Sequence, residues 1–189
     1  MIVAPRERIL RTAYRLFSRH GVQAIGINRI VAEAGIAKAT LYKHFASKEE
    51  LVLAVLQRRE DLWSHGWLEA EIERRASTPR ARLLAIFDAF DEWFRRDDYE
   101  SCLFASALLE IRDRTSPIAR ASIVHLAYVH RMIRDLAEGA GIPAPDDFAR
   151  QWQLIMLGSI TAAAIGDADA ARRARDVAAL LLERESPAP

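Results

Sequence analysis

Apolar residues recur at helical spacing along nearly the whole 189-residue chain, and no stretch sustains an apolar–polar alternation with a period of two. Spacings of three and four residues place side chains on one face of an α-helix, whereas half-buried strands need the two-residue period. The 8 glycines and 7 prolines mostly separate these stretches. We therefore predict an all-α fold of about nine helices.

Three short helices are predicted near the N-terminus. The first ends near Gly21, the second covers residues 27–34 and stops at Gly35, and the third covers about residues 38–45. Glycine most readily adopts the left-handed conformation that ends a helix. The second and third helices, joined by a tight turn, have the form of a helix-turn-helix motif.

The third of these helices has an apolar side and a polar side. Leu41 and Phe45 lie four residues apart and are predicted to anchor it on its neighbours. In a helix-turn-helix motif the outer face of this helix enters the major groove, where lysines neutralise phosphates and polar side chains donate hydrogen bonds. The residues predicted to contact DNA are Asn28, Arg29, Lys38, Ala39, Thr40, Tyr42, Lys43, His44 and Lys48.

Charge is distributed unevenly along the chain. The formal net charge of +1 would, taken alone, argue against a nucleic-acid partner. Residues 1–56 hold nine basic and four acidic residues, a net charge of +5, and the remainder holds 18 basic and 22 acidic residues, a net charge of −4. Such asymmetry suggests an anion-binding segment joined to a different module. Without the motif, a solvated basic face would explain it equally well.

A longer helix is predicted to follow the motif. Ser47 precedes it and Glu50 stands three residues on, which is the arrangement of a capping box. We expect a bend at Gly66, with the helix resuming toward Arg75. Further helical or apolar segments are predicted over residues 79–94, 102–111, 117–136, 148–165 and 170–182, before a frayed tail at residues 185–189.

An ordered, gap-free set of residues extends over about residues 6–55. Its members are Arg8-Ile9-Leu10, Ala13, Leu16-Phe17, Gly21, Ile30-Val31-Ala32, Ala34-Gly35-Ile36, Thr40-Leu41-Tyr42-Lys43-His44-Phe45 and Ser47-Lys48-Glu49-Glu50-Leu51. This set resembles the N-terminal domain of the tetracycline-repressor (TetR) family. Two positions depart from the family's usual pattern, because Ala37-Lys38-Ala39 stands where Ser-Lys-Gly is common, and Gly26 precedes the second helix where Ser or Thr is frequent.

The resemblance implies an all-helical homodimer. Residues 1–47 would form a helix-turn-helix DNA-binding head and residues 48–189 a ligand-binding and dimerisation bundle, linked by the long helix that begins at Lys48. Most members of the family are repressors that small effectors release from DNA.

Aromatic and neighbouring side chains of the second module are first of all candidates for its core. Some are expected to line a ligand pocket, because such pockets are largely apolar with a few polar groups. The pocket candidates are Phe87, Phe90, Trp93, Phe94, Cys102, Phe104, His125, Tyr128, Trp152 and Met156. A lone cysteine, and His125 and His130 five residues apart, give no metal-ligand pattern, so neither a metal nor a cofactor is expected.

The helix predicted over residues 148–165 is apolar on two sides, so both sides need a cover. One cover is the chain's own core, and the other is predicted to be a second subunit. A central helix within a monomer is the alternative. The residues predicted at this dimer interface are Leu154, Gly158, Ala162, Ile165, Ala174, Val177, Ala178 and Leu181.

We therefore interpret the chain as a non-enzymatic, dimeric transcriptional regulator of the repressor type. Its predicted partners are a palindromic double-stranded DNA operator, a second copy of itself and a small-molecule effector. The single cysteine, the lack of a signal-peptide pattern and the absence of an apolar run of ~20 residues favour a cytoplasmic protein without a membrane partner. Two alternatives remain: a small-molecule-binding or enzymatic bundle with a vestigial head, and a constitutive DNA-binding protein without an effector.

Overall fold

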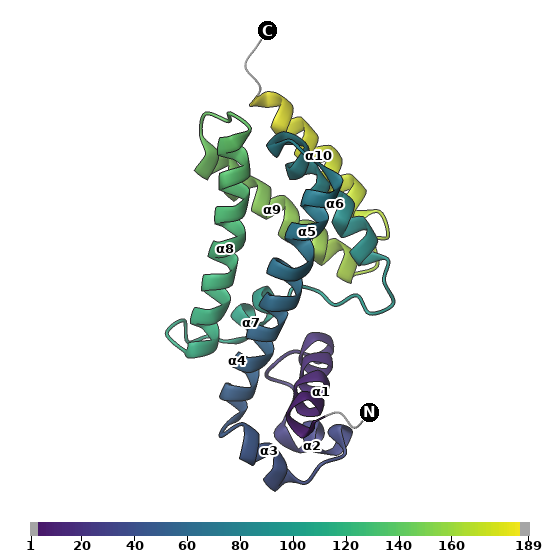
Figure 1. Ribbon diagram of the computed structural model, residues 1–189, viewed down its shortest axis with the longest axis vertical. Coiled ribbons are helices and arrows are strands. Elements are labelled where there is room, and N and C mark those ends of the chain that lie inside the picture. Colours follow the sequence, from purple (N-terminus) through teal and green to yellow (C-terminus); the bar gives the residue numbers. More distant parts are fainter. Residues whose placement is uncertain (1–3, 186–189) are drawn as a thin grey trace. The chain divides into compact units, whose positions relative to one another are not determined.

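The computed structural model describes residues 4–185, except for the side chains of Ser64 and His65; the predicted tail beyond residue 185 lies outside this range. Every regular element within it is helical (Figure 1), which confirms the predicted fold class. If the segment over residues 48–75 is counted as one continuous helix, the described residues form nine helices.

The first three helices are α1 (Pro5–His20), α2 (Ile27–Ala34) and α3 (Lys38–His44). Their ends agree with the prediction because the local signals act as expected. Gly21 and Gly35 follow α1 and α2 with φ angles of +83° and +61°, a region that glycine enters without a steric penalty.

The long helix consists of α4 (Lys48–Arg59), a π-helical segment η1 (Glu60–Leu68) and α5 (Glu69–Arg75). It begins as predicted, since the Glu50 amide donates to Ser47 Oγ over 3.0 Å. The helix resumes to Arg75 as expected, and Gly66, where a bend was expected, lies within η1. The wider i→i+5 hydrogen bonding of a π-helix keeps the backbone groups paired, so the helix continues through the glycine.

Five helices complete the chain: α6 (Pro79–Phe94), α7 (Leu103–Glu110), α8 (Pro117–Gly139), α9 (Pro145–Ala164) and α10 (Ala170–Arg184). The sequence placed the start of α9 three residues too late. Its first residue is a proline, which fits the first turn because no amide hydrogen is needed there. None of the described helices is long and apolar enough to cross a membrane.

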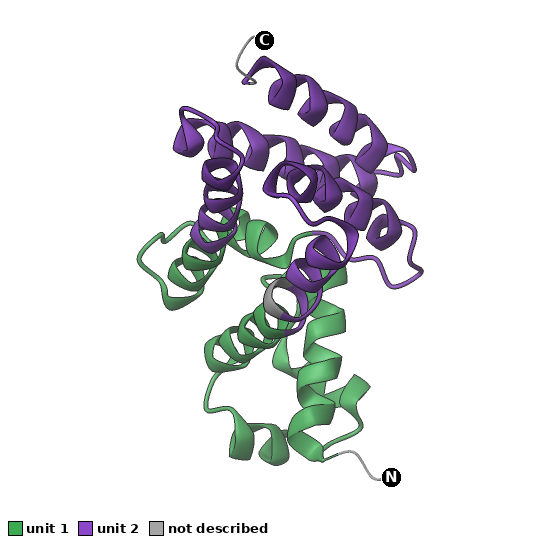
Figure 2. Ribbon diagram, turned by 45° about the horizontal axis from the view of Figure 1, so that its top comes forward, with its two compact units in different colours: residues 1–61, 102–126 green, residues 62–101, 127–189 purple. Residues whose placement is uncertain are grey.

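The chain divides into two compact units (Figure 2). Unit 1 consists of residues 1–61 and 102–126, and unit 2 of residues 62–101 and 127–189. Unit 1 therefore joins the predicted DNA-binding head with α4, α7 and the first part of α8. The division of function at residues 47 and 48 stays a prediction, because compactness alone does not tell which residues bind DNA.

The core of unit 1 joins segments far apart in sequence. Ile9 and Phe17 of α1 and Leu51 of α4 belong to the same buried cluster as Leu103 and Phe104 of α7. At its edge, Glu7 accepts hydrogen bonds from Arg11 and Arg58, and these bonds lower the pKa of the Glu7 carboxyl. The head is thus packed together with α4, which follows it directly, and with α7, which begins at Leu103.

The core of unit 2 is rich in aromatic side chains. Trp152 of α9 is fully buried, with its ring centroid 5.0 Å from that of Phe148 and 5.4 Å from that of Phe87. Phe90 and Trp93 of α6 continue this cluster, with ring centroids 5.5 Å apart. Aromatic burial of this extent stabilises the packing of α6 against α9.

Candidate nucleic-acid interface and ligand cavity

Helix α3 has one fully buried side and one side open to solvent. Leu41 and Phe45 are 0% and 1% exposed, so both act as anchors in the way their spacing predicted. Tyr42 is 46% exposed and its neighbour Lys43 is exposed as well. The remaining predicted contact residues on α3 are exposed or partly exposed: Lys38, Ala39, Thr40 and His44. The helix therefore presents a polar, basic surface to solvent, while its two anchor residues fix the opposite side in the core.

Contacts from α1 hold this motif in place. The Arg8 guanidinium lies 3.4 Å from the carbonyl oxygen of Gly35, in the turn between α2 and α3. The Arg6 guanidinium lies over the Phe45 ring, 5.2 Å from its centroid. Sequence spacing could not predict these contacts, because each joins α1 to a residue that lies many helical turns further along the chain.

The two predicted contact residues on α2 differ in their environment. Both are exposed, but Arg29 also contacts α1, with Nη2 3.2 Å from His20 Nε2. Arg15 and Arg29 both donate to Glu33, over 2.7 and 3.1 Å, and these hydrogen bonds lower the pKa of the Glu33 carboxyl. Arg29 thus helps to hold α2 on α1 in this structure.

Lys48 begins α4 and is only partly exposed. Its Nζ atom lies 3.5 Å from the carbonyl oxygen of Gln23. Burial lowers the pKa of the Lys48 amine, while the negative charge of Glu110 acts in the opposite direction. Neither Gln23 nor Glu110 was a predicted site residue, and no local pattern could have connected them.

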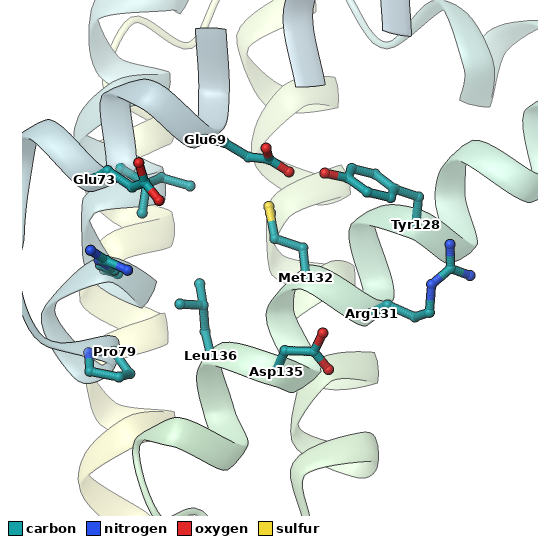
Figure 3. A pocket seen from close by; sticks show the side chains of 10 residues that line it. Glu69, Glu73, Pro79, Tyr128, Arg131, Met132, Asp135 and Leu136 are labelled. Carbon is teal, nitrogen blue, oxygen red and sulfur yellow. The ribbon is translucent and has the colours of Figure 1, made fainter. Parts of the chain in front are cut away.

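Unit 2 contains a cavity of about 560 Å³ between α5, the start of α6 and the second part of α8 (Figure 3). In Figure 3 Glu69 and Tyr128 face each other across it, above Met132. The lining residues are Glu69, Ile72, Glu73, Pro79, Arg82, Tyr128, Arg131, Met132, Asp135 and Leu136. Of the ten predicted pocket residues, this cavity includes Tyr128 alone.

The other pocket candidates belong to packed regions. Phe87, Phe90, Trp93, Trp152 and Met156 are at most 5% exposed, and Phe94 packs beside Phe90 and Trp93. These side chains lie in the interior of unit 2 and do not line this cavity, so their assignment to a pocket stays a prediction.

Three further pocket candidates lie in unit 1. The rings of Phe104 and His125 are stacked with centroids 3.5 Å apart, and both are buried. Cys102 caps the start of α7, and burial raises the pKa of its thiol. These residues lie in or beside the core of unit 1, and their assignment to a pocket also stays a prediction. Among the described residues, no group of three or more His, Cys, Asp or Glu side chains is arranged to hold a metal ion.

The predicted dimer residues divide into two sets. Leu154, Ile165 and Val177 are 70%, 82% and 53% exposed, and the structure adds Leu180 at 67%. Gly158 is exposed, and Ala162 and Leu181 are partly so. Ala174 and Ala178 instead lie at 8% and 0% exposure within unit 2, where α10 packs on α6 and α9. These two alanines are corrected from interface to core, because their small side chains allow that close packing.

Comparisons with known proteins agree with the helix-turn-helix geometry. The model of a family described as "Bacterial regulatory proteins, tetR family" matches residues 9–55. The HTH-type transcriptional activator FasR of Mycolicibacterium smegmatis is 39% identical over 92 residues, which cover 49% of this chain and 41% of FasR. An HTH-type transcriptional regulator of Staphylococcus aureus is 45% identical over 58 residues, or 31% of each chain. The chain thus spans less than half the length of these curated relatives.

Solved structures match over nearly the whole chain. A TetR-family transcriptional regulator from Streptomyces coelicolor superposes with a TM-score of 0.87 at 25% identity, covering 97% of this chain and 96% of that one. A TetR-family regulator from Agrobacterium tumefaciens has the same fold, with a TM-score of 0.82 at 21% identity over 97% and 98% of the two chains. The N-terminal motif thus belongs to the TetR family of transcriptional regulators, and the complete helical arrangement is the one found in solved structures of that family.

Proposed function

We propose that this protein is a DNA-binding transcriptional regulator of the repressor type, which binds a palindromic operator as a homodimer and releases it when a small effector binds. The observation that carries the proposal is α3, whose polar face around Tyr42 and Lys43 is exposed while Leu41 and Phe45 anchor the opposite face. This helix also lies in the segment with a net charge of +5.

Each exposed residue of α3 has a chemical role in this proposal. Lys38 and Lys43 neutralise backbone phosphates, and Thr40, Tyr42 and His44 form hydrogen bonds with phosphates or base edges. Two copies of α3 would occupy successive major grooves about 34 Å apart. The weakly negative remainder of the chain adds little electrostatic affinity, so binding depends on both heads being correctly spaced.

The proposal is tested with a mobility-shift titration of the DNA upstream of the protein's own gene, at several salt concentrations. We expect specific binding whose affinity falls steeply as salt rises, because phosphate contacts release counterions. Weak binding that is equal for all sequences would contradict a regulator. A promoter fusion decides the sign of regulation, because FasR is described as an activator and a repressor must lower expression.

The homodimer is proposed on the exposed apolar side chains of α9 and α10. Ile165→Asp is expected to raise the dimer dissociation constant about 100-fold, since a two-fold interface buries the introduced carboxylate twice, at a cost of at least ~1.4 kcal/mol each. Sedimentation velocity over a concentration series measures this. Leu109→Asp is the matched control, because Leu109 is 80% exposed on α7 and should leave the dimer intact. Equal effects of both substitutions would contradict the assigned face.

The cavity in unit 2 is proposed as the effector site. Its volume of about 560 Å³ suits a small organic ligand. Ile72, Met132 and Leu136 offer an apolar wall, and three carboxylates outnumber two guanidinium groups in the lining. We therefore expect a partly apolar ligand with a basic group.

Thermal shift with amphipathic amines and carboxylates of matched size tests this choice of ligand. Amines should raise the melting temperature, and Met132→Trp should remove the effect by filling the cavity. Val124→Trp, at a 60% exposed position on the same helix, is the control. Stabilisation by carboxylates alone would contradict the proposed ligand class, and operator binding without any ligand response would favour the constitutive alternative.

A further inference from the structure

Glu110, the last residue of α7, contacts the turn between α1 and α2, which lies 87 residues earlier in the chain. The backbone amide of Gln23 donates to Glu110 Oε2 over 2.7 Å. The other carboxylate oxygen lies 2.5 Å from the position that a Cβ atom on Gly21 would occupy. A side chain at Gly21 would therefore displace Glu110 as well as strain the backbone, whose φ angle is +83°.

The same turn also meets the predicted phosphate-binding lysine. Gln23 is held at both of its backbone groups, its amide by Glu110 and its carbonyl oxygen by Lys48 Nζ at 3.5 Å. The charge of Glu110 favours the protonated form of the Lys48 amine, against the burial that lowers the pKa of this group. Glu110 thus acts both on the α1–α2 turn of the head and on Lys48 at the start of α4.

Helix α7, which carries Glu110 at its end, is packed into the core of unit 1. Leu103, Phe104 and Ala107 are buried in the core that α7 shares with α1 and α4. Leu109, beside Glu110, is 80% exposed, so it lies on the side of α7 that faces away from the core. Glu110 ends the helix and contacts Gln23 of the head. Helix α7 lies outside residues 9–55, the segment that matches the DNA-binding family model.

We propose that Glu110 is a positioning residue for DNA binding, which holds the α1–α2 turn through Gln23 and places Lys48 at the start of α4 for contact with an operator phosphate. A residue from the second half of the chain would then help to set operator affinity. The inference rests on the proposed function, because it assigns a role in operator binding.

The physical reason is pre-organisation. A turn and a lysine that are already ordered in the free protein lose less conformational freedom when DNA binds, so more of the contact energy appears as affinity. A carboxylate that accepts a backbone hydrogen bond forms one of the stronger links of this kind. Without it, the turn and Lys48 must become ordered during binding.

Two substitutions separate the hydrogen bond from the negative charge of the side chain. Glu110→Ala should weaken operator binding about tenfold, because it removes a charge-assisted hydrogen bond. Glu110→Gln should stay within about threefold of the wild type, since its amide oxygen can still accept from Gln23. Glu138→Ala and Glu138→Gln, at an exposed position on α8, are the matched controls and should leave affinity unchanged.

Amide hydrogen exchange at Gln23, measured by NMR without DNA, supplies a second readout. Exchange at Gln23 should become about tenfold faster in Glu110→Ala and return toward the wild-type rate in Glu110→Gln. The amides of the neighbouring helix α1 should keep their protection in both variants. Unchanged exchange, equal losses of affinity for both variants, or a general loss of protection in α1 would overturn the inference. A wild-type protein that binds no operator would instead refute the proposed function, and Gln23 exchange would still decide whether Glu110 holds the turn.

Discussion

Replacing Tyr42 with alanine is expected to weaken operator binding about 100-fold while the protein stays folded and dimeric. Tyr42 is 46% exposed on the face of α3 opposite its anchors, so its loss leaves no internal cavity. A dimer loses the contact in both heads, and ~1.4 kcal/mol at each gives ~2.8 kcal/mol, which corresponds to two orders of magnitude in affinity. Fluorescence anisotropy with labelled operator DNA measures the change.

Two companion variants make the Tyr42 result specific. Tyr42→Phe removes only the hydroxyl and should retain part of the affinity, because the ring still contacts the DNA backbone or a base. Leu109→Ala, at an 80% exposed position in the same unit, should bind as the wild type does. If Tyr42→Ala binds the operator with unchanged affinity, α3 does not occupy the groove in the proposed way.

Replacing Trp152 with alanine is expected to lower the free energy of unfolding by about 3–5 kcal/mol, the usual cost of truncating a buried aromatic residue. The side chain is fully buried, and its ring lies 5.0 and 5.4 Å from those of Phe148 and Phe87. Removing it leaves a cavity that the surrounding helices fill only in part. Urea unfolding followed by circular dichroism measures the loss.

Trp152→Phe separates packing from hydrogen bonding. Nε1 of Trp152 is buried without a hydrogen-bond partner among the described residues, so phenylalanine gives up volume but no hydrogen bond. This variant should therefore retain most of the stability. Near-wild-type stability of Trp152→Ala would point instead to a residue that borders an open pocket, the second of the two roles that the sequence allowed.

Patterns within a few residues predicted the helices and the anchors of α3 well. Leu41 and Phe45 were identified because residues four apart share a helical face, and the start of α4 because Ser47 and Glu50 form a local cap. The π-helical segment around Gly66 was not expected. A glycine signals a possible break, but whether the helix continues as a π-helix depends on its surroundings.

Patterns of this kind could not separate core from cavity. Phe87 and Trp152 carry the same apolar, helical spacing that a pocket wall would carry, yet both are buried against other rings. The cavity is instead lined largely by residues that looked like ordinary helix surface, such as Glu69 and Asp135. Ala174 and Ala178 show the same limit, since a small residue suits a dimer interface and a tight internal contact equally well.

The amino-acid order thus determines the features that depend on neighbouring residues: where helices begin and end, which face of a helix is apolar, and that α3 carries an exposed polar, basic face. Helix propensity, capping and periodicity all act over one or two turns. The meeting of Glu110 with Gln23, the cavity beside α8 and the burial of Ala178 depend on which helices pack together. Only the tertiary structure determines which helices pack together, because this packing depends on contacts between residues dozens of positions apart.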